Sequence, residues 1–251
     1  GLGVNGAMPH SIIKDDIGIY YDATCPSQLE KIIQECSYNK GEIDRAKRCI
    51  DKIKKYRLTK YNTTLQAFSN NLIHGHFNKV VLVVDQRLGD TSIPYGMASS
   101  DTFDYMLECA ISENPQAKIL IKTHPDAILG GKKSHFTQYY DDEHCQFLRQ
   151  EYDPWSLFEN VDHVYVVSSL MGFEALMSQK VVTCFGAPFY AGWGLTDDRI
   201  SLSRKNKILS LEELFYAAYI DYSHYINPQK HEKCQIEEAI NCLIAMRNSE
   251  I

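Results

Sequence analysis

Three short apolar runs that end abruptly in polar side chains constrain the fold of this chain more than any other feature. They are VVLVVDQRLGD (80–90), KILIKTHPD (118–126) and HVYVVSSLMGFEAL (163–176). Runs of β-branched and apolar residues bounded by polar ones are typical of buried strands. A chain that repeats this pattern places its reactive side chains at the carboxyl ends of parallel strands, where open α/β sheets bind ligands.

Helical patterns alternate with these strands. An apolar stripe predicts a helix over 101–112, a shorter helix is expected after Asp153, and another over 171–179. Strand–helix–strand alternation with short connections predicts an α/β fold, with a parallel sheet and helices on both of its faces. The expected strands are 79–85, 118–122, 163–167 and 180–185, and residues 130–150 are expected to form a polar loop.

The chain on either side of this alternation has less regular patterns. A strand is expected at Ile17–Tyr21, and a helix begins near Cys25 with Ser27 as its N-cap and Glu30 completing a capping box. The expected domains are the remnant of an N-terminal lobe with a helical connection (1–77), a Rossmann-like lobe (78–210) and C-terminal helices that would brace two lobes (211–251).

The helix over 42–56 has the clearest pattern, because an apolar stripe and a basic stripe both repeat at helical spacing. The apolar stripe is Ile43, Ala46, Ile50 and Ile53, and the basic stripe is Arg45, Arg48, Lys52 and Lys55. The basic stripe is either a solvated face over a core helix or a surface that meets anionic lipid headgroups. The sequence leaves both interpretations open.

Size, charge and cysteine content exclude several classes of protein. The 251 residues suffice for one large domain or two small ones, and the net charge of −6 argues against a nucleic-acid partner. No apolar run approaches the roughly 20 residues that span a bilayer. The eight cysteines show no zinc spacing, and His74 and His76 are read as loop residues, so a reduced, cytosolic protein without a metal is expected. The opening at Gly1 suggests a fragment of a longer protein.

Two aspartates follow the first strand, and their surroundings distinguish them. Asp85 ends the strand directly, so we expect it to orient the loop. Gly89 gives the backbone freedom beside Asp90, which is the better candidate for meeting a substrate. A cap on a loop or helix is the alternative for either residue. The loop has no GxGxxG or GxxxxGK[ST] pattern, so neither a dinucleotide fingerprint nor a P-loop is present.

The two other strand ends suit a phosphate group. His124 is held extended by Pro125 and, with Lys122, supplies two potentially cationic groups. Ser168 and Ser169 directly precede a helix, where hydroxyls and free N–H groups favour an anion. A structural loop histidine and a simple helix cap are the alternatives. The absence of GxSxG gives no support to a hydrolase nucleophile.

The loop GAPFYAGWGLTDD (186–198) would line a sugar or base pocket with Tyr190 and Trp193, or simply wrap the core; we favour the pocket. Together these features fit glycosyl transfer from a nucleotide sugar whose leaving group bears a single phosphate. Histidine, lysine and a helix dipole can neutralise such a group without a metal. A metal-dependent hydrolase would need ligands at a spacing that the sequence lacks.

The same runs resemble the KpsC-type capsule polysaccharide family from Gly1 to about Leu243. The similar runs are IYYDAT, VVDQRLGDTSIPYG, KTHPD, DPWSLFENVDHVYVVSSLMGFEAL, CFGAPFYAGWGLTDDR, YSHYINP and CQIEEAI. The resemblance implies a two-lobed, GT-B-like fold and a retaining β-Kdo transferase. It implies CMP-Kdo as donor and a phosphatidylglycerol-type, lipid-linked acceptor at the cytoplasmic face of the inner membrane. Capsule assembly and export proteins are the implied partners, and no nucleic acid is expected.

The resemblance also assigns roles to residues. Asp90, in the Gln-x-x-x-Asp pattern of Gln86–Asp90, resembles the catalytic aspartate that attacks the anomeric carbon, and Gln86 is grouped with it. His124 resembles the histidine that binds the CMP phosphate. The substrate-binding set is His124, Lys122, Pro125, Ser168, Ser169, Gly172, Glu174, Tyr190 and Trp193.

One departure from the family concerns activity. The family's acidic Glu-Asp-Gly-Phe motif normally precedes the GLG that opens this chain, and the sequence does not contain it. The fragment is therefore expected to bind donor and to transfer weakly. The alternative is a non-catalytic capsule assembly or export subunit that keeps the fold as a binding module.

Overall fold

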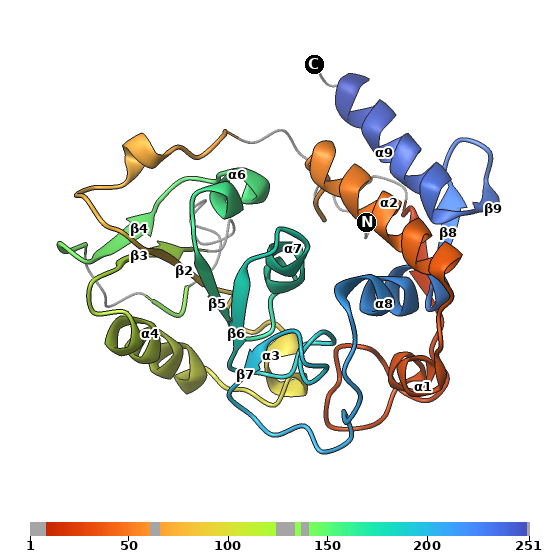
Figure 1. Ribbon diagram of the computed structural model, residues 1–251, viewed down its shortest axis with the longest axis horizontal. Helices are drawn as coiled ribbons and strands as arrows, with labels where there is room; N and C mark the ends of the chain where they lie inside the picture. Colours follow the sequence, from red (N-terminus) through yellow and green to blue (C-terminus); the bar gives the residue numbers. More distant parts are fainter. Residues whose placement is uncertain (1–8, 61–65, 124–133, 137–140, 250–251) are drawn as a thin grey trace. The chain divides into compact units, whose positions relative to one another are not determined.

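A computed structural model describes residues 9–60, 66–123, 134–136 and 141–249 (Figure 1). The chain divides into two compact units. One comprises 1–20, 26–64 and 209–251, and the other comprises 21–25 and 65–208. The three-part division expected from the sequence stays a prediction.

The second unit is built on a six-stranded sheet in the order β4-β3-β2-β5-β6-β7. Every neighbouring pair is parallel, as the alternation of strands and helices predicts. The four predicted strands are confirmed at the centre of the sheet. The strand bounds are β2 Val80–Val84, β3 Lys118–Lys122, β4 Cys145–Leu148, β5 His163–Val166, β6 Val181–Cys184 and β7 Asp197–Asp198.

Helices cover both faces of this sheet. Helix α4 (Asp101–Glu113) lies on one face, and α6 (Pro154–Glu159) and α7 (Met171–Met177) lie on the other (Figure 1). Alternate residues of a strand point to opposite faces. Val81 and Val83 of β2 therefore join Phe103 and Leu107 of α4 in one buried cluster.

Three local expectations are wrong. Ile17–Tyr21 is an irregular turn, and the nearby strand is β1 (Ser11–Ile13). The expected loop after β2 contains the short helix α3 (Ser92–Tyr95). The polar stretch 130–150 hides β4, because its four buried residues stand among charged neighbours and pair only at the edge of the sheet.

The first unit combines a small antiparallel sheet with several helices. Its strands follow the order β1-β8-β9, with β8 at Ser223–Asn227 and β9 at Glu232–Cys234. Ser27 caps α1 as predicted, by accepting a hydrogen bond from the backbone N–H of Glu30 at 3.2 Å. The helix bounds are α1 Gln28–Glu35, α2 Lys40–Lys55, α8 Leu211–Phe215, the π-helix η3 Tyr216–Asp221 and α9 Ile236–Ser249.

The basic stripe of α2 is partly engaged within this unit. Arg45 forms a bidentate ion pair with Glu237 of α9, with N–O distances of 2.7 and 2.9 Å. Lys52 hydrogen-bonds Asn241, also of α9, and the two helices lie side by side (Figure 1). Half of the stripe therefore holds two helices together, while Arg48 and Lys55 are exposed. Contact with a lipid surface stays a prediction.

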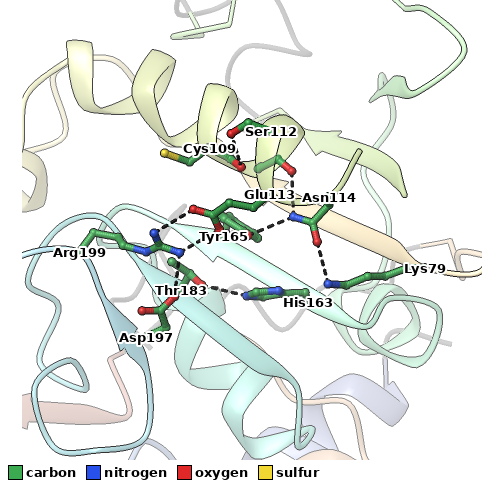
Figure 2. A network of polar contacts seen from close by, with 11 residues as sticks. Lys79, Cys109, Ser112, Glu113, Asn114, His163, Tyr165, Thr183, Asp197 and Arg199 are labelled. Carbon is green, nitrogen blue, oxygen red and sulfur yellow. Dashed lines mark hydrogen bonds and ion pairs between the residues drawn. The ribbon is translucent and has the colours of Figure 1, made fainter. Parts of the chain in front are cut away.

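A polar network joins the amino-terminal side of the sheet to the end of α4 (Figure 2). Glu113 accepts hydrogen bonds from Tyr165 at 2.7 Å and from Arg199 at 2.8 Å. Arg199 also pairs with Asp197 of the edge strand β7 at 2.8 Å. Because Glu113 ends α4, these bonds fasten the helix to both the centre and the edge of the sheet.

His163 extends this network along the first residues of the strands (Figure 2). Its Nε2 lies 2.9 Å from Oγ1 of Thr183, and that hydroxyl donates to Asp197 at 3.2 Å. Burial, reinforced by the nearby charge of Lys79, lowers the pKa of His163 to about 4. The imidazole is therefore neutral in the folded protein at neutral pH.

The lowered pKa of His163 predicts a loss of stability in mild acid. The unfolded chain takes up a proton near pH 6.5, whereas the folded protein does so only near pH 4, so protonation favours unfolding between these values. We expect His163→Gln, which keeps a hydrogen-bond donor but does not titrate, to lose this part of the pH dependence. Urea unfolding of both proteins from pH 7 to pH 4 measures it. Parallel curves would contradict the assignment.

Candidate functional site

The buried carboxylate of Asp85 is the anchor of the carboxyl edge of the sheet. The backbone N–H of Asp85 donates to the carbonyl of Lys122 at 3.0 Å, so this residue still follows the alignment of β2 on β3. Its side chain accepts hydrogen bonds from the hydroxyl of Ser134, from Nδ1 of His135 at 3.0 Å and from the N–H of Gln86 at 2.8 Å. The structure thus shows Asp85 holding the loop, as the sequence predicts.

Gln86 connects the end of β2 to the end of β5. Its side-chain oxygen accepts from the backbone N–H of Ser168 at 2.8 Å, and its Nε2 donates to the hydroxyl of Ser168 at 3.0 Å and to that of Ser92 at 3.2 Å. The two hydroxyls lie 3.2 Å apart. Because only 4% of Gln86 is exposed and its amide is engaged, these contacts make it a positioning residue for the serines.

Asp90 lies half-buried at the start of α3. One carboxylate oxygen accepts a hydrogen bond from the backbone N–H of Ser92 at 2.9 Å. Within the described residues its other oxygen has no hydrogen-bond partner. Gly89, before it, has a φ of +80°, a conformation that L side chains rarely adopt, so the predicted need for glycine is confirmed. A carboxylate oxygen that the described residues leave without a partner can bind or attack a substrate.

The two serines contact different neighbours. Ser168 belongs to the Gln86 network, and Ser169 accepts a hydrogen bond from the backbone N–H of Met171, at the start of α7, at 3.3 Å. Both serines are half-buried. The side-chain cap expected at the start of α7 is not formed, because the N-cap residue is Leu170, which makes no side-chain cap hydrogen bond. Ser169 stands one residue earlier and bonds the first N–H of the helix instead.

Lys122 is buried at the end of β3. Burial is the main cause that lowers its pKa, against the charges of Glu151, Glu174 and Asp85. Glu174, in the first turn of α7, is itself buried. The charges of these three carboxylates oppose the effect of burial on the ammonium group of Lys122. His124 and Pro125, the other predicted phosphate ligands, lie outside the described residues.

Tyr190 and Trp193 are core residues, which supports the alternative reading over the pocket wall that we favoured. Neither side chain has exposed surface. The Trp193 Nε1 donates to the carbonyl of Phe189 at 2.8 Å, and the Tyr190 hydroxyl donates to the carbonyl of Ser169. The three glycines let this loop turn inward, so its aromatic side chains face the protein. Through its hydrogen bond to Ser169, Tyr190 supports the turn between β5 and α7.

Three polar residues of this edge were not singled out from the sequence. Ser92 stands in an Asp-Thr-Ser run, whose spacing suits a side chain that bonds the backbone two residues on. Ser134 and His135 stand in a lysine- and glycine-rich stretch that has no motif, so nothing in the sequence points to them. Their place depends on long-range packing.

Across the parts of the chain that the structure describes, no group of three or more His, Cys, Asp or Glu side chains could hold a metal ion. Likewise, none of the helices in those parts is long and apolar enough to cross a membrane.

The described residues form an α/β protein in which a carboxylate, an amide and hydroxyls lie at the carboxyl edge of a parallel sheet. Ligand sites of open α/β sheets are found at this edge. Residues 36–226 match the family described as capsule polysaccharide biosynthesis protein. The chain belongs to this family, which confirms the resemblance inferred from its motifs.

Curated relatives share much of this sequence. The chain is 40% identical over 255 residues to the capsule polysaccharide modification protein LipA of Neisseria meningitidis, covering 98% of this chain and 36% of LipA. It is 41% identical over 251 residues to the lipopolysaccharide-processing protein LpsZ of Rhizobium meliloti, covering 99% of this chain and 57% of LpsZ. The chain therefore spans between a third and three-fifths of these relatives.

Two solved structures resemble the chain closely. The β-Kdo 2,4 transferase of Thermosulfurimonas dismutans KpsC has a TM-score of 0.89 at 41% identity, covering 97% of this chain and 75% of that one. The β-Kdo 2,7 transferase of the same KpsC has a TM-score of 0.74 at 32% identity, covering 95% and 73%. The predicted α/β, GT-B-like fold class is confirmed.

Gly172 has a packing role that predicts a specific mutational coupling. A Cβ at this position would lie 2.1 Å from the hydroxyl oxygen of Tyr190. We expect Gly172→Ala to lower the free energy of unfolding by about 1–3 kcal/mol, because the core is overpacked. Tyr190→Phe removes the clashing oxygen and should restore part of the loss.

Chemical denaturation of the two single variants and the double variant measures this coupling. Gly41→Ala is the matched control, because Gly41 is exposed on α2 and a Cβ there would meet only the side-chain oxygen of Asn39, at 3.2 Å. It should be neutral or slightly stabilising. Additive losses for Gly172→Ala and Tyr190→Phe would show that the two groups do not meet.

Proposed function

We propose that this chain is a glycosyltransferase domain that moves Kdo from CMP-Kdo to a lipid-linked acceptor, with retention of anomeric configuration, during synthesis of a capsule polysaccharide linker. Family membership and the likeness to two β-Kdo transferases support this class of reaction. The stronger likeness to the 2,4 transferase favours a β-2,4 linkage. The structural observation that carries the proposal is the connection between Asp90 and the serines.

Asp90 and Ser168 are linked through described contacts alone. The Asp90 carboxylate holds Ser92, and the hydroxyl of Ser92 meets both Gln86 and Ser168. A nucleophile on one strand end is thereby set at a fixed place relative to an anion-binding hydroxyl on the next. Such fixed geometry between reacting groups is a main source of catalytic rate.

The proposed reaction is a double displacement at the anomeric carbon. The Asp90 carboxylate oxygen that does not bond Ser92 attacks that carbon, the bond to the phosphate oxygen breaks, and CMP leaves with the electron pair. The hydroxyl of the acceptor then attacks the anomeric carbon, the bond to Asp90 breaks to release its carboxylate, and the hydroxyl proton passes to water. Two inversions give net retention.

Ser168, Ser169 and Lys122, with His124 from the sequence, are proposed to stabilise the departing phosphate. Hydroxyl and cationic donors suit an oxyanion whose charge grows as the bond breaks. A monophosphate leaving group carries little enough charge for such donors to suffice, so we propose that transfer needs no divalent metal. The chain is proposed to act at the cytoplasmic face of the inner membrane, beside capsule assembly and export proteins.

Asp90→Asn tests the nucleophile directly. The amide oxygen of asparagine can still accept the N–H of Ser92, so the start of α3 should be kept while the nucleophile is lost. We expect the transfer rate to fall at least about 1,000-fold, as for other residues that bond to the reacting carbon. The melting temperature should stay within about 2 °C of the wild type, because no buried group is removed.

Transfer is measured by incubation with CMP-Kdo and a Kdo-terminated lipid-like acceptor, with the new linkage assigned by NMR. Glu108→Gln, an exposed carboxylate-to-amide change on α4, is the matched control and should leave the rate unchanged. Unchanged transfer by Asp90→Asn would reject Asp90 as nucleophile. CMP release by the wild type without a new β-Kdo linkage would reject transferase activity and favour a donor-binding capsule subunit.

A further inference from the structure

We propose that His135 and Asp85 form a positioning pair that orients Gln86 and, through it, the two serine hydroxyls of the site. This inference rests on the proposed function, since it adds to that site a residue which no sequence motif points to. His135 would not touch substrate. Its effect would reach the reaction through the backbone and side chain of Gln86.

The pair is enclosed and closely bonded. The exposed fraction of the side chain is 3% for His135 and 0% for Asp85. Nδ1 of His135 lies 3.0 Å from Oδ1 of Asp85 and 2.9 Å from the carbonyl oxygen of Gln86. The imidazole also stacks on the ring of Phe103, with a centroid distance of 3.8 Å and an interplanar angle of 7°.

These contacts fix the tautomer of the imidazole. A carboxylate oxygen and a carbonyl oxygen can only accept, so Nδ1 of His135 must carry the proton that both share. Nε2 is buried and has no hydrogen-bond partner in the described residues. A proton on Nε2 would be a buried donor without an acceptor among those residues, so the geometry places the shared proton on Nδ1.

Hydrogen bonds hold both the backbone N–H and the carbonyl of Gln86. Asp85 accepts from its backbone N–H at 2.8 Å, and His135 donates to its carbonyl at 2.9 Å. A residue held at both peptide groups has a fixed Cα–Cβ direction. From this fixed backbone, the side-chain amide meets Ser92 and Ser168 at 3.2 and 3.0 Å.

Stability alone does not explain this arrangement. Burying a carboxylate and an imidazole removes both from water, and an apolar pair of similar volume would often be as stable. What the polar pair adds is direction, because hydrogen bonds fix angles that apolar packing leaves free. Direction is what the Gln86 amide needs in order to serve two hydroxyls at once.

Two substitutions of His135 separate positioning from packing. His135→Phe keeps a ring to stack on Phe103 but removes the donor. His135→Asn loses the ring but can place its side-chain N–H near the position of Nδ1. If the pair positions Gln86, His135→Phe should lower kcat about 10- to 100-fold with the donor KM changed less than about threefold. His135→Asn should keep kcat within about fivefold of the wild type, although its melting temperature falls further.

A purely structural His135 predicts the opposite ranking. Activity would then follow stability, and His135→Asn would be the more damaged enzyme. His163→Phe is the matched control, since it removes another partly buried imidazole, from the opposite end of the strands. It should lower the melting temperature and leave kcat within about twofold. A loss of kcat in the control as large as in His135→Phe would overturn the proposal.

A measurement without catalysis tests the same pair if the wild type transfers no sugar. His135→Phe, Ser168→Ala and the double variant are compared by thermal unfolding. Residues that share one hydrogen-bond network give non-additive losses. We expect the melting temperature of the double variant to lie at least about 2 °C above the value obtained by subtracting both single losses from that of the wild type. Additive losses would reject the connection through Gln86, whatever the reaction proves to be.

Discussion

The hydrogen bond from the backbone of Asp85 to Lys122 is the contact on which the candidate site depends. It keeps β2 aligned on β3 one residue beyond the last strand pair, so the Asp85 carboxylate enters the interior and Gln86 turns toward β5. From that position Gln86 meets the hydroxyls of Ser92 and Ser168. The parallel arrangement supplies the rest, because it brings the ends of β2 and β5 to one edge.

Stability and chemistry are divided between the two ends of the strands. The network around Glu113, Tyr165 and Arg199 holds the end of α4 at the amino-terminal side of the sheet. Its hydrogen bonds use both carboxylate oxygens of Glu113 (Figure 2). The carboxyl edge instead has half-buried hydroxyls and a carboxylate oxygen without a partner among the described residues. A ligand can supply the hydrogen-bond partners that such groups do not find among the described residues.

The strands of the sheet centre could be predicted from the sequence because each is a continuous apolar run buried on both faces. The motif residues Asp85, Asp90 and Ser168 could be placed at its edge for the same reason. The polar edge strand β4 could not, and neither could His135, whose partners lie about 50 positions away in sequence. Tyr190 and Trp193 show the other limit: an aromatic loop has the same composition whether it lines a pocket or fills the core.

The most direct test of the account is to trap the sugar on the enzyme. In a double displacement, incubation with CMP-Kdo alone should leave Kdo covalently attached through the carboxylate that attacks. Peptide mass spectrometry after acid quenching should find the adduct on the peptide that contains Asp90, and no adduct in Asp90→Asn. An adduct on another carboxylate, or β-Kdo transfer by Asp90→Asn at the wild-type rate, would contradict the central claim that Asp90 forms the covalent intermediate.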